Sequence, residues 1–213
     1  MRTCTWSEWK AELPHLIPLQ AIFLLTRYAG VGKDTFEKWL CESYKNEYTF
    51  YVVHFADPLK EMCTDLVQMI HQKVLKRPLE QMPTLDSFHD PVKKQQNFYE
   101  DCPGWNPRVC MQWVGTDWMR YYDPLFWSRQ LPKHIEKVEE WYKGKETMGW
   151  IVPDWRFINE WEELRRFYPN RPIIRLRLER DNHTPHTVHS SEVPIPNEHI
   201  DYTVKLPGTL DEF

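Results

Sequence analysis

Glycine and alanine are both scarce in this chain of 213 residues, which contains seven glycines and four alanines. No apolar run approaches the ~20 residues that a membrane span requires, and the polar start lacks the apolar core of a signal peptide. Basic residues are not in excess either, because the net charge is −4. Such a charge gives no electrostatic footprint for duplex nucleic acid or an acidic membrane surface. We therefore expect neither a membrane nor duplex nucleic acid as a partner.

The cysteines do not form the pattern of a disulfide framework. They number five, an odd count, and no two of them are spaced as C-x-x-C. Such a set is typical of proteins from a reducing compartment, so we expect a cytoplasmic protein. The eleven tryptophans, by contrast, are numerous and imply a bulky, aromatic-rich core.

Apolar strand-like runs alternate with helical patterns along the chain, and this alternation indicates the fold class. Strands are predicted at 20–26, 49–54, 148–153 and 172–178, with a weaker one at 201–205. Helices are predicted at 33–45, 57–76, 107–121, 124–143 and 156–168, after a short helix that a capping box at 5–8 starts. This order predicts an α/β fold with a mostly parallel sheet covered on both faces.

The chain length predicts a single domain over 1–213. Within it, residues 77–106 are rich in proline, aspartate and glutamine and are predicted to form an irregular insertion. Residues 179–200 are polar and contain three prolines, which is typical of a mobile loop and suits a lid.

The most informative segment is the loop from Gly30 to Thr35, which lies between a predicted strand and a predicted helix. Backbone N–H groups and the helix dipole would face one point there, where phosphate oxygens can bind. Lys33 would add a cation for the β- and γ-phosphates. The pattern G-x-x-x-x-G-K-[ST] is not complete, because Arg27 and Asp34 replace a glycine and a hydroxyl, and the hydroxyl follows at Thr35. The alternative is an ordinary strand–turn–helix junction with a solvated lysine.

Further polar residues follow the later strands, where open α/β sheets bind ligands. Asp154 ends an apolar run, as does the carboxylate that helps to hold Mg²⁺ in phosphate-loop enzymes, although a helix N-cap is the alternative. Arg156 follows it closely. Arg175, Arg177 and Arg180 flank a flexible loop, the predicted lid, and suit a transferring phosphoryl group. Solvated strand edges are the alternative for Arg175 and Arg177.

A second set of polar residues has helical spacing. Asp57 and Pro58 form a good helix start, and Lys60 lies in the same turn. Arg108 and Gln112 are four residues apart and could share one face of a helix. Arginine forks suit a phosphate, and glutamine suits the hydrogen-bonding edge of a base.

Together these segments resemble the deoxynucleoside monophosphate kinases of tailed phages and their relatives, which are P-loop kinases. That family shows a G-x-x-G-x-G-K-D-T loop, then F-A-D-P-L-K, R-x-x-x-Q-x-x-G-T, D-x-R-F-x-N-E and H-x-S-E, and a terminal D-x-x-[IV]-x-N-x-G-[ST]-L-x-x-L stretch. The matching segments, roughly within residues 20–212, are Gly30–Thr35, Phe55–Lys60, Arg108–Arg120, Asp154–Glu160, His189–Glu192 and Asp201–Leu210. Asp34 is part of the family's own variant of the loop, whereas Arg27 departs from the family glycine.

The resemblance implies a P-loop NTPase-like three-layer fold of the nucleoside-monophosphate-kinase type, with a mobile lid and a possible homodimer. It also implies phosphoryl transfer from Mg·ATP to a deoxynucleoside 5′-monophosphate. The residues implied for the ATP phosphates are Gly30, Val31, Gly32, Lys33, Asp34 and Thr35, and those for Mg²⁺ are Asp34, Thr35 and Asp154. The residues implied for the acceptor are Asp57, Lys60, Arg108, Gln112, Thr116 and Arg120. The residues implied to stabilise charge on the phosphoryl group during transfer are Lys33, Arg156, Arg177 and Arg180.

Trp127 or Trp113 is a candidate to stack on the acceptor base, with core packing as the alternative. Three other functions also stay open. Phosphomevalonate kinase of the animal type and dephospho-coenzyme A kinase have related loops and phosphorylate other acceptors. A degenerate protein that binds a nucleotide or a partner without turnover is the non-enzymatic alternative, and Arg27 supports it.

Overall fold

The computed structural model describes residues 1–16, 20–26, 31–142, 148–180 and 193–207. The chain forms two compact units. Unit 1 comprises Met1–His54 and Leu131–Phe213, and unit 2 comprises Phe55–Gln130. Within the described ranges, no helix combines the length and apolarity needed to cross a lipid bilayer.

Unit 1 is built on a six-stranded sheet in which all the paired strands run parallel, in the order β1-β6-β5-β2-β4-β3. The strands are β1 (Arg2–Thr5), β2 (Ile22–Thr26), β3 (Thr49–Val52), β4 (Met148–Val152), β5 (Ile173–Glu179) and β6 (Tyr202–Lys205). The five predicted strands are confirmed, and so is the α/β class with a parallel sheet. Strand β1 was not predicted, because it is short and only Cys4 in it is buried.

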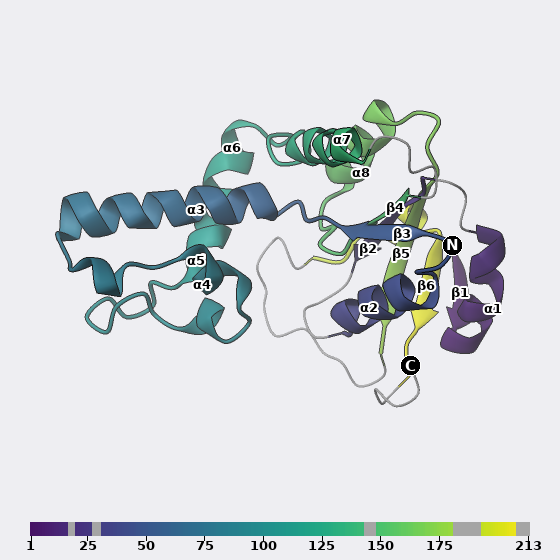
Figure 1. Ribbon diagram of the computed structural model, residues 1–213, viewed down its shortest axis with the longest axis horizontal. Helices are drawn as coiled ribbons and strands as arrows, with labels where there is room; N and C mark the ends of the chain where they lie inside the picture. Colours follow the sequence, from purple (N-terminus) through teal and green to yellow (C-terminus); the bar gives the residue numbers. More distant parts are fainter. Residues whose placement is uncertain (17–19, 27–30, 143–147, 181–192, 208–213) are drawn as a thin grey trace. The chain divides into compact units, whose positions relative to one another are not determined.

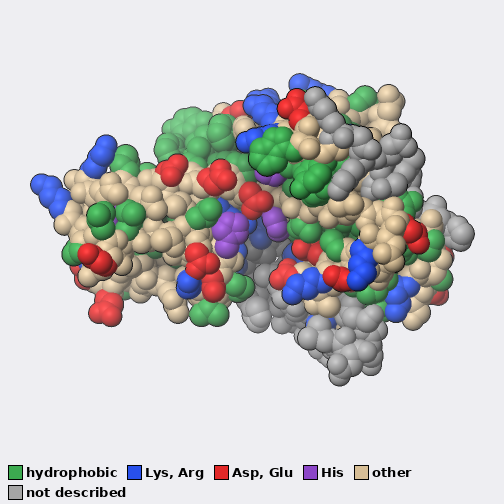
Figure 2. Space-filling model, viewed as in Figure 1, with side chains coloured by type: hydrophobic (Ala, Val, Ile, Leu, Met, Phe, Trp, Pro, Cys, Tyr) green, Lys and Arg blue, Asp and Glu red, His purple; other side chains and the backbone are tan. Residues whose placement is uncertain are grey.

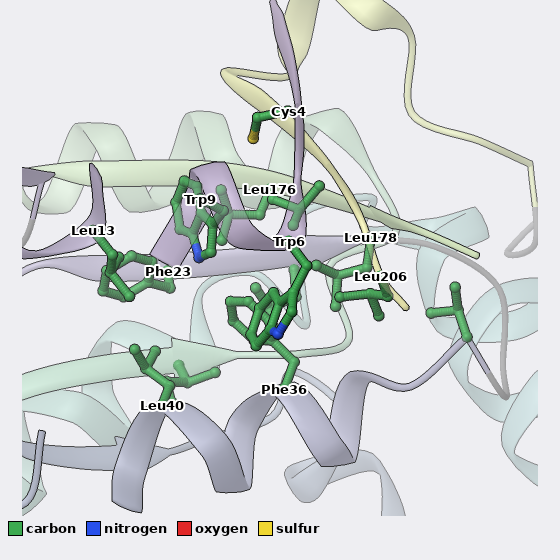
Figure 3. Close-up of a cluster of buried hydrophobic side chains, with 14 of the residues drawn as sticks. Cys4, Trp6, Trp9, Leu13, Phe23, Phe36, Leu40, Leu176, Leu178 and Leu206 are labelled. Carbon is green, nitrogen blue, oxygen red and sulfur yellow. The ribbon is translucent and has the colours of Figure 1, made fainter. Parts of the chain in front are cut away.

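Helices cover both faces of this sheet (Figure 1). Helices α1 (Trp6–Leu16) and α2 (Lys33–Ser43) pack on one face, where the side chains of Trp9, Phe36 and Leu40 meet Phe23 of β2 (Figure 3). Each fully buried side chain of this size stabilises the fold by roughly 1.5–3 kcal/mol. The predicted capping box starts α1, since Thr5 Oγ1 accepts from Glu8 N at 3.3 Å and Glu8 Oε2 accepts from Thr5 N at 2.7 Å.

The opposite face of the sheet is covered by α7 (Gln130–Trp141) and α8 (Ile158–Phe167). Side chains along a strand alternate between faces, and Trp150 of β4 donates its indole N–H to Glu139 of α7 at 3.2 Å. On the same face, the guanidinium of Arg175 in β5 lies 4.4 Å from the ring centre of Trp161 in α8. Because both faces are covered, all five residues of the central strand β2 are buried.

Unit 2 is helical. Helix α3 (Asp57–Met69) continues into a π-helical segment, η1 (Ile70–Leu75), and α5 (Pro107–Gln112) continues through the π-helical η4 (Trp113–Met119) into α6 (Arg120–Tyr122). The predicted helices at 57–76 and 107–121 are confirmed, although their π-helical turns were not predicted. The segment predicted to be irregular holds three short helices: η2 (Leu79–Gln81), α4 (Leu85–His89) and η3 (Lys93–Gln95).

Of the predicted lid, residues 181–192 lie outside the described residues, and η6 (Asn197–His199) follows them in unit 1. Arg27 and Gly30 also lie outside the described part of the chain. On the face shown in Figure 2, acidic and basic side chains are interspersed among the described residues.

Candidate functional site

Three neighbouring strands of unit 1 end at the same edge of the sheet. Strand β2 is central, with Leu24 opposite Val152 of β4 and Thr26 opposite Arg177 of β5. Because all three strands are parallel, the residues that follow them lie close together. The backbone N–H of Trp155 donates to Leu25 O at 3.2 Å, which holds the turn after β4 against β2.

The helix after β2 begins at a glycine with a special conformation. Gly32 is the N-cap of α2 and has φ 108° and ψ 23°, in the left-handed region that favours glycine. Its carbonyl accepts from Phe36 N at 3.0 Å, and no side chain caps the helix. The N–H groups of the first turn have no carbonyl partner within the helix, so this terminus suits an anion.

Arg180 brings a cation to the same glycine. A Cβ atom added to Gly32 would stand 3.0 Å from Arg180 Nη2 and 3.3 Å from a methyl group of Leu206. The Nε and Nη2 atoms of Arg180 are buried and have no hydrogen-bond partner among the described residues. Because buried N–H donors without an acceptor are unfavourable, this arrangement fits an anionic ligand beside Arg180 at the start of α2.

Carboxyl groups also lie near Lys33 at the start of α2. Burial, together with the negative charges of Asp34 and Asp154, raises the pKa of Glu37 to about 7, whereas the charge of Lys33 opposes the shift. Glu37 Oε1 is buried and has no hydrogen-bond partner among the described residues. Asp34, Glu37, Asp154 and Lys33 therefore share one electrostatic environment. Sequence reasoning missed Glu37, although its spacing of three residues from Asp34 places both on one face of α2.

The residues present fit Mg²⁺ in the mode that it usually adopts with nucleotides. In the described ranges, no group of three or more histidine, cysteine, aspartate or glutamate side chains is arranged to hold a metal ion. Mg²⁺ is usually bound by one or two carboxylates together with substrate phosphates and waters, so it does not need such a cage. Asp34, Thr35 and Asp154 supply the expected oxygen donors, and Thr35 is half-buried in the first turn of α2.

Two of the predicted cations of unit 1 take part in contacts that stabilise the fold. Arg177 is buried, and its guanidinium donates to Asn197 Oδ1 and Ile195 O, so it fixes the segment before η6 to β5. Arg156 is exposed, and its backbone N–H donates to Glu160 Oε2 at 2.9 Å. The carboxylate of Glu160 therefore caps the start of α8.

The motif residue Asp201 also has a structural role. Its carboxylate accepts from the backbone N–H of Arg175 at 2.9 Å and from its Nη2 at 2.6 Å. The pair joins β5 to the start of β6. Asp201 therefore has partners within the chain, and its presence at this position is accounted for without a bound ligand.

In unit 2, the acceptor residues predicted on the helix after Asn106 repeat every fourth position. Arg108, Gln112, Thr116 and Arg120 are all half-buried, so they border the buried face of α5, η4 and α6. Asn106 caps α5 by accepting from Val109 N at 3.0 Å. This stripe is therefore partly accessible to a ligand.

Trp127 is placed differently from the prediction that it stacks on a base. Its ring is buried in the core of unit 2, and its Nε1 donates to Gly115 O at 2.9 Å. Core packing, the alternative, is thus the role that the structure gives to Trp127. Trp113, in contrast, is 53% exposed and stacks on Trp118 with ring centres 5.6 Å apart.

The structure thus brings together Gly32, Lys33, Asp34, Asp154 and Arg180 in unit 1 and leaves the predicted acceptor residues in unit 2. The candidate site formed by these five residues is called the loop site below.

A scan against models of protein families found no match for this chain, and a search of curated proteins found no similar sequence.

Proposed function

We propose that the protein transfers the γ-phosphoryl group of Mg·ATP to a deoxynucleoside 5′-monophosphate, giving ADP and the diphosphate. The observation that carries this proposal is the pair of buried Arg180 nitrogens, Nε and Nη2, that have no hydrogen-bond partner in the described part of the chain and lie beside left-handed Gly32, at the uncapped start of α2. A triphosphate is an anion that would pair with both groups at once. The family resemblance of the sequence supports the acceptor class.

Phosphoryl transfer needs positioning and charge stabilisation more than covalent help from the protein. The backbone N–H groups at the start of α2 would bind phosphate oxygens, and the ammonium of Lys33 would follow the β- and γ-phosphates. Arg180 would stabilise the charge on the equatorial oxygens of the group in transfer. Arg177 does not share this role, because its guanidinium already binds the segment before η6.

Asp34, Thr35 and Asp154 would hold magnesium at the loop site. When bound there, the ion would offset the negative charge of the phosphates. An oxygen of the acceptor phosphate then forms the new bond to the γ-phosphorus as the bond to the β-phosphate oxygen breaks, and ADP leaves.

The test is ADP release from Mg·ATP with dGMP, dTMP, dCMP, dAMP and phosphomevalonate offered separately. We expect turnover with at least one deoxynucleotide and a loss of about a hundredfold or more in Lys33→Met. Lys38→Met is the matched control, because Lys38 is an exposed lysine on the same helix. Unchanged turnover in Lys33→Met would remove the proposal.

The other outcomes of this assay are also informative. Turnover with phosphomevalonate alone would replace the acceptor and keep the loop site. A folded protein that binds ATP but turns over no acceptor would be a nucleotide-binding protein without kinase activity.

A further inference from the structure

The outer face of the continuous helix formed by α5, η4 and α6 carries large apolar side chains. The exposed residues on this face include Val109, Trp113, Trp118, Tyr121 and Tyr122. They follow one another at intervals of three to five residues, so they form one stripe along the helix, which is called the aromatic stripe below. In Figure 2, hydrophobic side chains gather where Figure 1 shows α6.

The core of unit 2 does not require these side chains. Cys110 and Val114 of the same helix are buried, and they pack with Trp127 in the core. An amphipathic helix normally has polar residues on the face away from its core. Helix α7 follows this rule, because its exposed residues are mainly polar: Lys133, His134, Glu136, Lys137 and Glu140. The aromatic stripe departs from it, and a large exposed apolar patch indicates an interaction surface.

The π-helical segment η4 places two indole rings of the stripe together. In an α-helix, residues five apart point about 140° away from each other, whereas the wider turn of a π-helix brings them toward the same side. Trp113 and Trp118 are five apart, and their rings stack with centres 5.6 Å apart and planes at 27°. Because π-helical turns are rare and often lie at functional sites, this stack supports a function for the stripe.

The stripe has the size of a small protein–protein contact. An aromatic side chain covers roughly 150–250 Å² when it is fully buried. At their exposed fractions, Trp113, Trp118, Tyr121 and Tyr122 leave roughly 500 Å² of aromatic surface on one molecule. Two such stripes in contact would bury roughly 1,000 Å², the area at which specific interfaces begin. Tryptophan and tyrosine are also the side chains that contribute most binding energy in such interfaces.

The charges on this part of the helix favour a second copy of the chain as the partner. The charged residues of η4 and α6 are Asp117 and Arg120, which have opposite signs. In an antiparallel pair about a two-fold axis, the aspartate of each copy can face the arginine of the other. The aromatic rings are self-complementary as well, because the edge of one ring attracts the face of another.

We propose that the aromatic stripe is the surface through which two copies of this chain associate about a two-fold axis. Association through this surface needs neither ATP nor an acceptor, so the inference does not rest on the proposed function. The family resemblance does not indicate which surface a homodimer would use, and no residue of the stripe belongs to the loop site.

The first experiment is sedimentation velocity of the full chain over about a hundredfold range of concentration. We expect a reversible equilibrium of monomer and dimer for the native protein. Tyr121→Arg should weaken association about a hundredfold or more, because a two-fold contact would then bury two added charges. A native protein that stays monomeric throughout, or a Tyr121→Arg variant that associates like the native protein, would overturn the proposal.

Two control variants accompany Tyr121→Arg. Tyr121→Phe keeps the ring and should associate like the native protein, which separates a contact surface from a general sensitivity of this position. Trp141→Ser removes a 76% exposed aromatic side chain from α7 in unit 1 and should also leave association unchanged. Tyr121 is itself 76% exposed, so its variants should fold, and circular dichroism checks this.

The second experiment follows hydrogen exchange of the native protein, without ligands, as its concentration rises. Peptides that cover 113–122 should exchange more slowly at high concentration, and those that cover 133–141 should not change. A dimer that protects other peptides and leaves 113–122 unchanged would contradict the proposal.

The outcome is independent of the kinase assay. A protein that associates through the stripe but phosphorylates no acceptor would support this interface and contradict the proposed function. Turnover by a protein that stays monomeric would do the reverse.

Discussion

At Gly32 the backbone has a conformation that side chains disfavour, and Arg180 occupies the space beside it. We expect Gly32→Ala to lower the free energy of unfolding by about 1–2 kcal/mol through backbone strain. It should also weaken ATP binding, because the new methyl group would meet Arg180 Nη2 at 3.0 Å. Chemical denaturation and calorimetric titration with ATP measure the two effects.

Gly104→Ala is the matched control for this prediction. Gly104 also has a positive φ, of 84°, but an added Cβ meets no atom within 4 Å. The control should therefore show a similar loss of stability and normal ATP binding. Normal ATP binding in Gly32→Ala would contradict the assignment of Gly32 to the ATP-binding loop site.

Glu37 makes the stability of the protein depend on pH. In the folded chain its carboxyl has a pKa of about 7, raised by burial from 4.5. Between these two values the folded state holds a proton that the unfolded state has released, so the free energy of unfolding falls as pH rises toward 7. Glu37→Gln removes this dependence.

We expect Glu37→Gln to match the native protein near pH 4 and to be more stable by on the order of 1 kcal/mol at pH 8. Thermal unfolding without nucleotide or Mg²⁺ measures the difference at each pH. Glu42→Gln changes an exposed glutamate of the same helix and should show no such trend. A stability difference that stays constant between pH 4 and pH 8 would contradict the prediction.

At the scale of elements, the pairing of β3 with β4 depends on a glycine under an aromatic ring. Gly149 lies opposite Phe50, and an added Cβ would stand 2.4 Å from Phe50 Cε1. The ring also packs against Phe23, with ring centres 5.9 Å apart. We expect Gly149→Ala to lower the free energy of unfolding by about 1–3 kcal/mol, because the ring must leave its position.

A double-variant cycle tests the cause of that loss. In a Phe50→Leu background the ring is absent, so the cost of Gly149→Ala should become much smaller. Denaturant unfolding of the four proteins gives the coupling energy. Additive losses would show that the ring is not what requires the glycine.

The predicted elements have a local signal in their own amino-acid composition, whereas the elements that were not predicted depend on pairing or packing with distant segments. Strands β2 and β4 are apolar runs that the sheet buries on both faces, so composition alone indicates them. Strand β1 has one buried side chain in four and becomes a strand only by pairing with β6. The π-helical turns of η1 and η4 have no comparable local signature.

At the scale of the whole molecule, the loop site and the residues implied for the acceptor nucleotide belong to different compact units. Each ligand should therefore protect its own unit from hydrogen exchange. We expect ATP with Mg²⁺ to slow exchange at 31–36 and 154–156, and a deoxynucleotide to slow it at 57–60 and 108–120. Mass spectrometry of peptides after exchange measures both patterns. Protection of the same peptides by both ligands would contradict this assignment.

The sequence by itself determined the order of strands and helices, the α/β class and the loop between β2 and α2. These depend on apolar periodicity and on glycine and lysine positions within a few residues of one another. Only the tertiary structure decided that Asp154 and Arg180 follow strands on either side of β2, because strand order in a sheet joins residues far apart in the chain. It also decided that Arg177 and Trp127 make internal contacts. Hydrogen-bond partners such as these are chosen by the packing of distant segments, which no local pattern in the sequence specifies.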